Sequence, residues 1–322
     1  MTATKPLVTF MIATRNRVDE LVKTLDSCLK QDWPSKEILV VDDASSDGTH
    51  RTVTERFPAV EIVRFEKNRG SIAARNSILQ RANGDYVIAL DDDSRFVEPN
   101  ACRRIVERME GEVDLGIVSF QVIGPEFPER TIDAGRLRGE WHCSSFADCG
   151  AAIRRTMLGN TGLFPEFFFH TYEEPDLAIR AWDAGFRILQ WNDIIVYHEF
   201  SGLNRNEQRT HRRQARNEAC SVVMRYPWYL VLPALAARLA GQLRYAWRRG
   251  WAWQEPRVWF ETLVFLPLAL RHRRPVQSRT VKIGLAVNRV RTADPEAVRR
   301  LGNQSWWRIL LGSLDEEGGP GA

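Results

Sequence analysis

The chain has 322 residues, 44% hydrophobic and 27% charged, which is typical of a globular protein with one large domain or two smaller ones. Its five cysteines are odd in number and form no Cys-x-x-Cys pair. This argues against a disulfide framework or a zinc site and fits a reducing compartment. The net charge of +4 is uneven: residues 1–200 hold 24 Lys and Arg against 32 Asp and Glu, whereas residues 201–322 hold 21 against 9.

Strands and helices alternate over the first 122 residues. Apolar, β-branched runs predict strands at 7–13, 37–43, 61–66, 86–91 and 115–122. Helical patterns lie between them at 18–31, 47–57 and 71–82. Such alternation predicts an α/β fold, with a mostly parallel sheet and helices on both of its faces.

The middle of the chain is less regular. Residues 146–157 predict a short strand or turn that enters a helix. Residues 173–186 predict a helix with Pro175 near its first turn, and residues 187–200 predict a last strand that ends at His198.

Basic helices are expected beyond residue 200, where seven of the eleven tryptophans lie. The apolar stretches 228–237 and 258–270 are shorter than the roughly 20 residues that span a bilayer. The tail, 315–322, has the composition of a disordered segment. The first ten residues lack the basic region and apolar core of a signal peptide, so we expect a cytoplasmic protein.

Polar clusters follow four of the predicted strands, at 14–17, 42–49, 68–71 and 91–94. Open α/β sheets bind ligands at the carboxyl ends of their strands. The four clusters therefore predict one binding crevice.

Three adjacent aspartates, Asp91, Asp92 and Asp93, follow the strand at 86–91. Carboxylates at a strand end hold hard cations such as Mg²⁺ or Mn²⁺, which are commonly shared with a ligand phosphate. A solvated acidic turn or a helix N-cap would have the same composition. The second acidic pair, Asp42 and Asp43, favours the metal site because it is expected to face the same crevice.

Other side chains complete this predicted site. Arg15, Arg17, Arg69 and Arg75 are candidates to meet an anionic ligand. One of the acids Glu173, Glu174 and Asp176 at a predicted helix start could act as a general base, although acids there also simply favour the helix dipole, which is our interpretation of Asp176. His198 is either a third metal ligand or a structural histidine.

These motifs form an ordered set over about the first 200 residues. In order they are VTFMIATRNR (8–17), EILVVDDASSDGT (37–49), NRGSIAARN (68–76), ANGDYVIALDDDS (82–94), DCGAAIRR (148–155), GNTGLFPEFFFHTYEEPDLAIRAWDAGFRI (159–188) and VYHEFS (196–201). The chain resembles the family 2 glycosyltransferases, inverting enzymes of GT-A fold that use nucleotide-sugar donors. The resemblance implies a Rossmann-like GT-A catalytic domain at 1–205, followed by a basic, Trp-rich helical extension at 206–322.

The resemblance also implies a role for each matching position. The donor would be bound by Thr14, Arg15, Asn16, Arg17, Asp43, Asn68, Arg75, Asp91 and Asp92. The divalent cation, Mg²⁺ or Mn²⁺, would be held by Asp93 with Asp91 and His198. Glu174 occupies the catalytic-base position, where the family commonly has Asp, so Glu173 is the alternative base. Trp141, Gly150 and Asp176 are the acceptor-side candidates, and His142 is a further sugar contact.

The implied reaction moves a sugar from a UDP-, dTDP- or GDP-sugar to a hydroxyl of a glycan or lipid-linked acceptor, in cell-surface polysaccharide synthesis. The extension fits either an anionic membrane surface at the inner face of the cytoplasmic membrane or a helical cap on the catalytic domain. No nucleic-acid-binding motif is recognised, and no nucleic-acid partner is expected.

Three other functions remain open from the sequence. A nucleotidyltransferase would need a glycine-rich loop after the first strand, where ATRNR has no glycine. A phosphoryl-receiving signalling domain would carry its acidic pair after that first strand, whereas here the first strand ends in ATRNR. A catalytically inactive sugar-binding module would have a dispensable Asp93 or Glu174.

Overall fold

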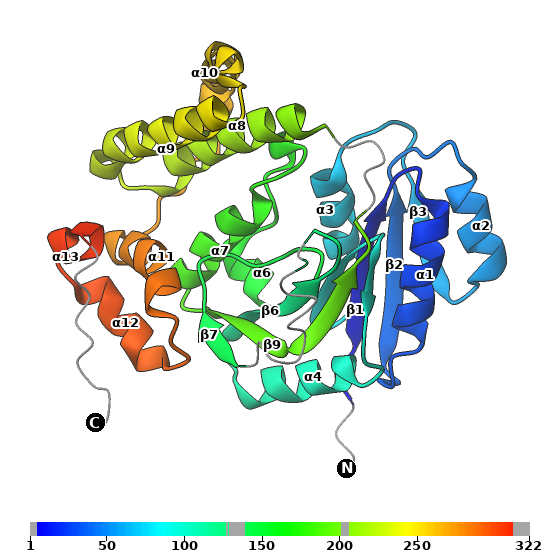
Figure 1. Cartoon of the computed structure of the whole chain (residues 1–322). Coiled ribbons are helices and arrows are strands. Elements are labelled where there is room, and N and C mark those ends of the chain that lie inside the picture. Colours follow the sequence, from blue (N-terminus) through cyan, green and yellow to red (C-terminus); the bar gives the residue numbers. More distant parts are fainter. Residues whose placement is uncertain (1–4, 127, 129–138, 201–205, 312–322) are drawn as a thin grey trace.

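The computed structural model describes residues 5–126, 128, 139–200 and 206–311, so the predicted disordered tail lies outside the described residues. A single mixed sheet occupies the centre of this part (Figure 1). Its strands are β1 (Val8–Thr14), β2 (Lys36–Asp42), β3 (Val60–Arg64), β4 (Tyr86–Asp91), β5 (Ser94–Phe96), β6 (Leu115–Ile123), β7 (Glu140–His142), β8 (Ala151–Arg154) and β9 (Arg187–His198).

The sheet order is β3-β2-β1-β4-β8-β6-β9-β5, with β7 also paired to β9. Strand β1 is parallel to β2 and β4, β2 to β3, and β6 to β9. Strand β8 runs antiparallel between β4 and β6, and β5 and β7 run antiparallel to β9. The predicted α/β fold with a central sheet is confirmed, although only half of these strand pairs are parallel.

Helices cover both faces of the sheet because side chains of successive strand residues point to opposite faces. On one face, Phe10 and Ile12 of β1 pack with α1 (Val18–Leu29), α2 (Thr49–Arg56) and α4 (Ala101–Gly111). On the other face, Met11 packs with α3 (Ser71–Arg81), α6 (Met157–Thr161) and α7 (Glu173–Asp183). Both faces of β1 are therefore buried, as its unbroken apolar run requires.

The helical region that follows the sheet was also expected. It comprises α8 (Glu207–Arg225), α9 (Trp228–Arg248), α10 (Glu255–Arg271), α11 (Ser278–Val290), α12 (Pro295–Asn303) and α13 (Trp306–Leu311), with short 3₁₀ turns η1 (Glu166–Phe168) and η2 (Ala252–Gln254). None of the helices in the described ranges has the length and hydropathy that a membrane span needs.

Helix α8 packs closely on the part of the chain that forms the sheet. Its residues 215–225 are all buried, and Val223 and Met224 join the apolar cluster that covers α3 and α7. The division at 205/206 falls beside residues outside the described ranges and stays a prediction. The packing of α8 nevertheless ties the two predicted parts together.

Asp176 in α7 forms the main polar contact between α7 and α8. Its side chain is fully buried, and its carboxylate accepts hydrogen bonds from Arg225 at 2.8 Å and 3.1 Å and from Ser221 at 3.0 Å. Arg180 donates to it from within α7 at 3.1 Å. Burial raises the pKa of Asp176, but the two guanidinium groups outweigh this and hold it below 3.8.

We predict that Asp176→Ala lowers the free energy of unfolding by about 3–5 kcal/mol, because it leaves two buried arginines without their counter-charge. Urea unfolding at pH 7 measures this loss. Since the pKa is depressed in the fold, the contribution of Asp176 is present above pH 3.8 and disappears as the pH falls through the depressed value. Glu107→Ala, on the exposed side of α4, is the control and should change stability by no more than about 0.5 kcal/mol. Equal losses in the two variants would contradict the interpretation.

Candidate active site

A crevice of about 1350 Å³ lies at the carboxyl ends of β1 and β4, between the sheet and the first turns of α8. The predicted site residues that line it are Thr14, Arg15, Asn16, Arg17, Asp43, Asn68, Arg75, Asp91, Asp92, Trp141, Glu173, Glu174 and His198. Asp93 is buried and contacts both Arg17 and His198, which line the crevice. The polar strand ends therefore come together as expected.

The loop 68–71 is fixed by Asp43. The carboxylate of Asp43 accepts hydrogen bonds from the backbone N–H groups of Arg69 at 2.6 Å and Gly70 at 2.9 Å. Gly70 has φ 90°, and a Cβ atom there would lie 2.4 Å from the carbonyl oxygen of Phe169. Glycine is thus required both by the backbone conformation and by the close approach of the loop that precedes α7.

The end of β1 holds the end of β4. Thr14 Oγ1 donates to Asp92 at 2.8 Å, and the guanidinium of Arg17 donates to Asp92 and Asp93, each at 3.0 Å. Burial raises the pKa of Asp92 to about 7, against the opposing effect of Arg17. The guanidinium of Arg17, in the loop that follows β1, therefore holds Asp92 and Asp93 together.

Asp91, Asp93 and His198 form a cluster that could hold a cation. Pairing of β5 with β9 places Ser94 opposite His198, which brings the histidine to the end of β4. His198 Nε2 lies 2.9 Å from Asp93 Oδ1 and 3.8 Å from Asp91 Oδ2. An octahedral Mg²⁺ site with bonds of about 2.1 Å places neighbouring ligand atoms about 3 Å apart, which is the spacing of His198 and Asp93, and Asp91 lies slightly farther from His198 than this.

A carboxylate lies behind the imidazole of His198, since Glu126 Oε2 is 3.4 Å from its Nδ1. Partners of this kind orient metal-binding histidines. Burial lowers the pKa of His198, but the hydrogen bond to Asp93 and the negative charge of Asp91 raise it by more, to above 6.5 overall. Metal and proton therefore compete for Nε2.

Arg75 of α3 connects the aspartates to the glutamate pair. Its buried guanidinium donates to Asp91 at 2.7 Å and to Glu173 at 2.8 Å, and it also contacts Asp148. Burial lowers the pKa of Arg75, but the carboxylates outweigh this and keep it above its ordinary value. One arginine thus neutralises charge from three separate segments.

Asp148 belongs to this site although the sequence analysis gave it no role. It lines the crevice beside Cys149 and forms a second acidic cluster with Glu173 and Glu174. The sequence signal was its position as the first residue of the stretch DCGAAIRR. The stretch is one of the motifs that carry the family resemblance, but no role was predicted for its acidic side chain.

The two glutamates at the start of α7 face different surroundings. Both line the crevice, but Glu173 is only 1% exposed and is paired with Arg75, whereas Glu174 is partly exposed. Burial, followed by the charge of Asp148, raises the pKa of Glu173 to about 7 and that of Glu174 well above 4.5. Glu174 is thus the member of the pair that a bound ligand can reach.

The acceptor-side candidates divide into two groups. Trp141 lines the crevice, with the guanidinium of Arg291 5.6 Å from its ring centroid. His142 is fully buried, and its Nδ1 lies 3.1 Å from the carbonyl oxygen of Ile188. Gly150 and Asp176 are also buried and do not line the crevice.

Helix α8 contributes cations that the sequence analysis did not assign to the site. Arg209 and Arg213 line the crevice, and the guanidinium of Arg213 lies 4.5 Å from the ring centroid of Phe169. Basic residues at a spacing of four on a helix are common on solvated surfaces. Here α8 packs beside the crevice, so Arg209 and Arg213 line the candidate site.

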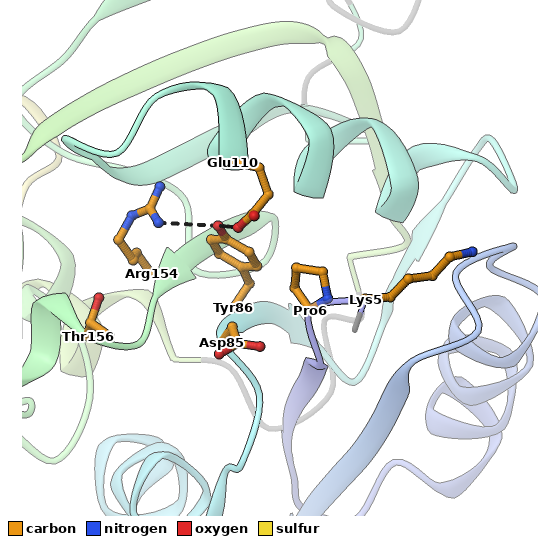
Figure 2. Close-up of a pocket in the computed structure, with 7 residues that line it drawn as sticks. All are labelled: Lys5, Pro6, Asp85, Tyr86, Glu110, Arg154 and Thr156. Carbon is orange, nitrogen blue, oxygen red and sulfur yellow. Dashed lines mark hydrogen bonds between the residues drawn. The ribbon is translucent and has the colours of Figure 1, made fainter. Parts of the chain in front are cut away.

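A smaller hollow of about 290 Å³ lies near the start of β4, at the opposite edge of the sheet (Figure 2). Three of its polar side chains are engaged with one another: Arg154 donates to the hydroxyl of Tyr86 at 3.2 Å, and that hydroxyl contacts Glu110. The large crevice, with its many carboxylates and its three overlapping candidate cation clusters, is therefore the better functional site.

Comparison with known proteins gives a family match for the first half of the chain. Residues 9–162 match the model described as glycosyl transferase family 2. Succinoglycan biosynthesis protein ExoO of Rhizobium meliloti is 37% identical over 106 residues, which are 33% of this chain and 30% of that protein. TuaG of Bacillus subtilis is named as a putative teichuronic acid biosynthesis glycosyltransferase. It is 31% identical over 130 residues, which are 39% of this chain and 51% of that protein. The matches thus span only about a third to a half of these two relatives.

Solved structures share the fold. Mannosyltransferase PcManGT from Pyrobaculum calidifontis, in complex with GDP-Man and Mn²⁺, is 22% identical with a TM-score of 0.56, and the match covers 82% of this chain and 88% of that one. S. aureus TarS 1–349, in complex with UDP-GlcNAc, is 17% identical with a TM-score of 0.61, and the match covers 95% and 92%. The chain therefore has the GT-A glycosyltransferase fold.

We predict that Mn²⁺ added with UDP or GDP raises the thermal unfolding midpoint of the protein, because a ligand that binds only the folded state stabilises it. Asp93→Asn should lose most of this shift. The shift should also shrink as the pH falls below the raised pKa of His198, because protonation blocks Nε2.

The matched control is Asp85→Asn, at the hollow of Figure 2 on the opposite edge of the sheet, which should keep the full shift. An Asp93→Asn variant stabilised as much as the wild-type protein would show that the cation binds elsewhere.

Proposed function

Since residues 9–162 form a family 2 glycosyltransferase region, we propose that this protein transfers a sugar, with inversion, from a nucleotide-diphosphate donor to an acceptor hydroxyl. One observation carries the proposal. The buried guanidinium of Arg75 contacts Asp91 of the candidate cation cluster and Glu173, which directly precedes the crevice-lining Glu174.

The donor is proposed to lie along the ends of β1, β2 and β4. Thr14, Asn16 and Asp43 line the side expected for the nucleoside, and Arg15 and Arg17 bring positive charge toward its diphosphate. A divalent cation, Mg²⁺ or Mn²⁺, at Asp91, Asp93 and His198 would neutralise charge on the departing diphosphate. PcManGT and TarS were solved with GDP- and UDP-linked ligands, so both nucleotide classes are candidates here, as are dTDP-sugars.

Transfer then needs a general base beside the hydroxyl of the sugar acceptor. Glu174 takes the proton of the acceptor hydroxyl as the oxygen attacks the anomeric carbon from the face opposite the nucleotide. The bond from that carbon to the diphosphate oxygen breaks, the electron pair leaves with the diphosphate, and the configuration inverts. Glu173 is less suited to this task because its carboxylate is buried against Arg75.

The acceptor is proposed to be a glycan or a lipid-linked sugar of a cell-surface polysaccharide. Two relatives are named for succinoglycan and teichuronic acid biosynthesis, which supports this class. Trp141 lines the same crevice and offers an aromatic ring to a sugar of the acceptor.

A membrane-facing surface would suit such an acceptor. Helices α9 and α10 expose large apolar side chains: Trp228, Tyr229, Leu232, Leu243 and Trp247 on α9, and Trp259, Phe260, Leu263, Val264 and Leu270 on α10. Residues 206–275 also hold 13 Arg against four acidic residues. Tryptophan and tyrosine favour the bilayer interface, and each basic residue near an anionic surface contributes about 1 kcal/mol. We therefore propose peripheral binding of this surface to the inner face of the cytoplasmic membrane.

We predict that Glu174→Gln retains donor binding but lowers transfer by several orders of magnitude, because the amide cannot accept the proton. Donor binding is measured by calorimetry and transfer by nucleotide release in the presence of acceptor. In the wild-type protein, transfer should fall as the pH drops through the raised pKa of Glu174, above the 4.5 of an ordinary glutamate. Unchanged transfer by Glu174→Gln, with loss in Glu173→Gln, would assign the base to Glu173.

We also predict that the protein floats with vesicles containing phosphatidylglycerol and not with neutral vesicles. The double change Phe260→Ser with Leu263→Ser should reduce the bound fraction, since it removes exposed apolar area from α10. Val113→Ser, at a still more exposed apolar residue outside α9 and α10, is the control and should bind like the wild-type protein. Absence of the wild-type protein from the anionic vesicle fraction would exclude this surface as a membrane contact.

A further inference from the structure

The segment directly before the glutamate pair has an unusual backbone. Phe169, Thr171 and Tyr172 have φ angles of 67°, 71° and 69°, and none of them is glycine. Left-handed backbone costs about 1–2 kcal/mol for an ordinary residue, and for a β-branched residue such as Thr171 it is a clear outlier. Three such residues occur within four positions, so contacts with the surrounding protein must hold the segment in this conformation.

One side chain of α8 contacts this segment through three carbonyl groups. Asn217 is fully buried, and its Nδ2 donates to the carbonyl oxygens of Phe168 at 3.2 Å, His170 at 3.0 Å and Thr171 at 2.9 Å. Its Oδ1 accepts two hydrogen bonds from Arg216, at 2.8 Å and 3.0 Å. The amide is therefore locked with its donor atoms toward the strained backbone.

Arg216 strengthens the same attachment. Its Nη2 donates to the carbonyl oxygen of Phe168 at 3.0 Å, and its guanidinium lies 4.2 Å from the ring centroid of Phe265 in α10. Arg216 is itself buried. The attachment of residues 168–171 to α8 thus rests on two buried side chains.

The far side of the strained segment touches the loop 68–71, here termed the donor loop because it carries the donor-binding candidate Asn68. A Cβ at Gly70 would collide with Phe169, and the hydroxyl of Ser71 lies 3.0 Å from His170 Nδ1. The segment ends at Tyr172, which directly precedes α7 and has φ 69° and ψ 8°. Its conformation therefore decides where Glu173 and Glu174 begin the helix relative to the donor loop.

We propose that Asn217 is a positioning residue for the transfer reaction: it holds the segment 169–172, with Phe169, Thr171 and Tyr172 at positive φ, and so fixes the proposed base, Glu174, against the donor site. This inference rests on the proposed function, because it assigns a task to the same site. It makes α8 part of the catalytic unit.

The decisive variant is Asn217→Asp, which keeps the shape of the side chain but cannot donate to the three carbonyls. Amide hydrogen exchange of the peptide spanning 168–174 should speed up in this variant, while peptides of β1 and β4 stay unchanged. The turnover number should fall about 10²-fold, because a misplacement of about 1 Å costs that much, while the dissociation constant of the donor stays within about twofold. Asn288→Asp in α11, an exposed Asn that contacts Ser144, is the matched control and should show neither change.

A second variant separates positioning from general stability. Thr171→Gly removes the steric cost of the left-handed conformation together with a hydroxyl that has no hydrogen-bond partner among the described residues. In the Asn217→Asp background it should recover about fivefold in turnover, and in the wild-type background it should change turnover little. A residue that only fills the core would give no such rescue.

Unchanged exchange at 168–174 in Asn217→Asp, or unchanged turnover, would overturn the proposal. Parallel loss of turnover, donor affinity and thermal stability without rescue by Thr171→Gly would overturn it as well. Hydrogen exchange is measured on the protein alone, so it tests the attachment whether or not a donor is turned over. A wild-type protein that transfers no sugar would count against the proposed function, whereas the exchange result would still decide whether Asn217 holds the segment.

Discussion

The compensation of crowded negative charge by two arginines is the interaction on which the site depends. Arg17 contacts Asp92 and Asp93, and Arg75 contacts Asp91, Glu173 and Asp148. Five carboxylates thus share two cations, and all lie near or below the surface of one crevice. The remaining negative charge is what a divalent cation would neutralise, and the three donors of Asp91, Asp93 and His198 are spaced to hold one.

The same contacts organise the surrounding fold. Arg75 projects from α3, its three partners come from β4, the loop before β8 and the start of α7, and Arg17 comes from the end of β1. Buried charges must be paired, so these segments can adopt few arrangements relative to one another. Helix α8 adds a second layer, because Asn217 holds the segment before α7 and Arg225 pairs with Asp176. The position of Glu174 is therefore set from two sides.

Much of this could be predicted from the sequence because it depends on local patterns. Apolar runs and the polar ends that follow them located β1, β2, β4 and β9 and the residues at their ends. The direction of each strand was harder to predict, because an apolar run has the same composition in either direction. Strand β8, for example, runs antiparallel between β4 and β6. Arg75 lies 73 residues before Asp148, Arg225 lies 49 residues after Asp176, and Thr171 lies 46 residues before Asn217, so no local spacing could reveal these contacts. His142 illustrates the opposite error, because a polar residue beside Trp141 turned out to be fully buried.

The central claim, that this crevice transfers a sugar with inversion, is tested most directly by the product itself. The purified protein is incubated with Mn²⁺ and a panel of UDP-, GDP- and dTDP-sugars with candidate glycan acceptors, and the anomeric configuration of the new linkage is read by NMR. We predict turnover of one nucleotide class, loss of turnover on metal chelation, and a product whose anomeric configuration is opposite to that of the donor. Retention of the donor configuration, or turnover unaffected by chelation, would contradict the account.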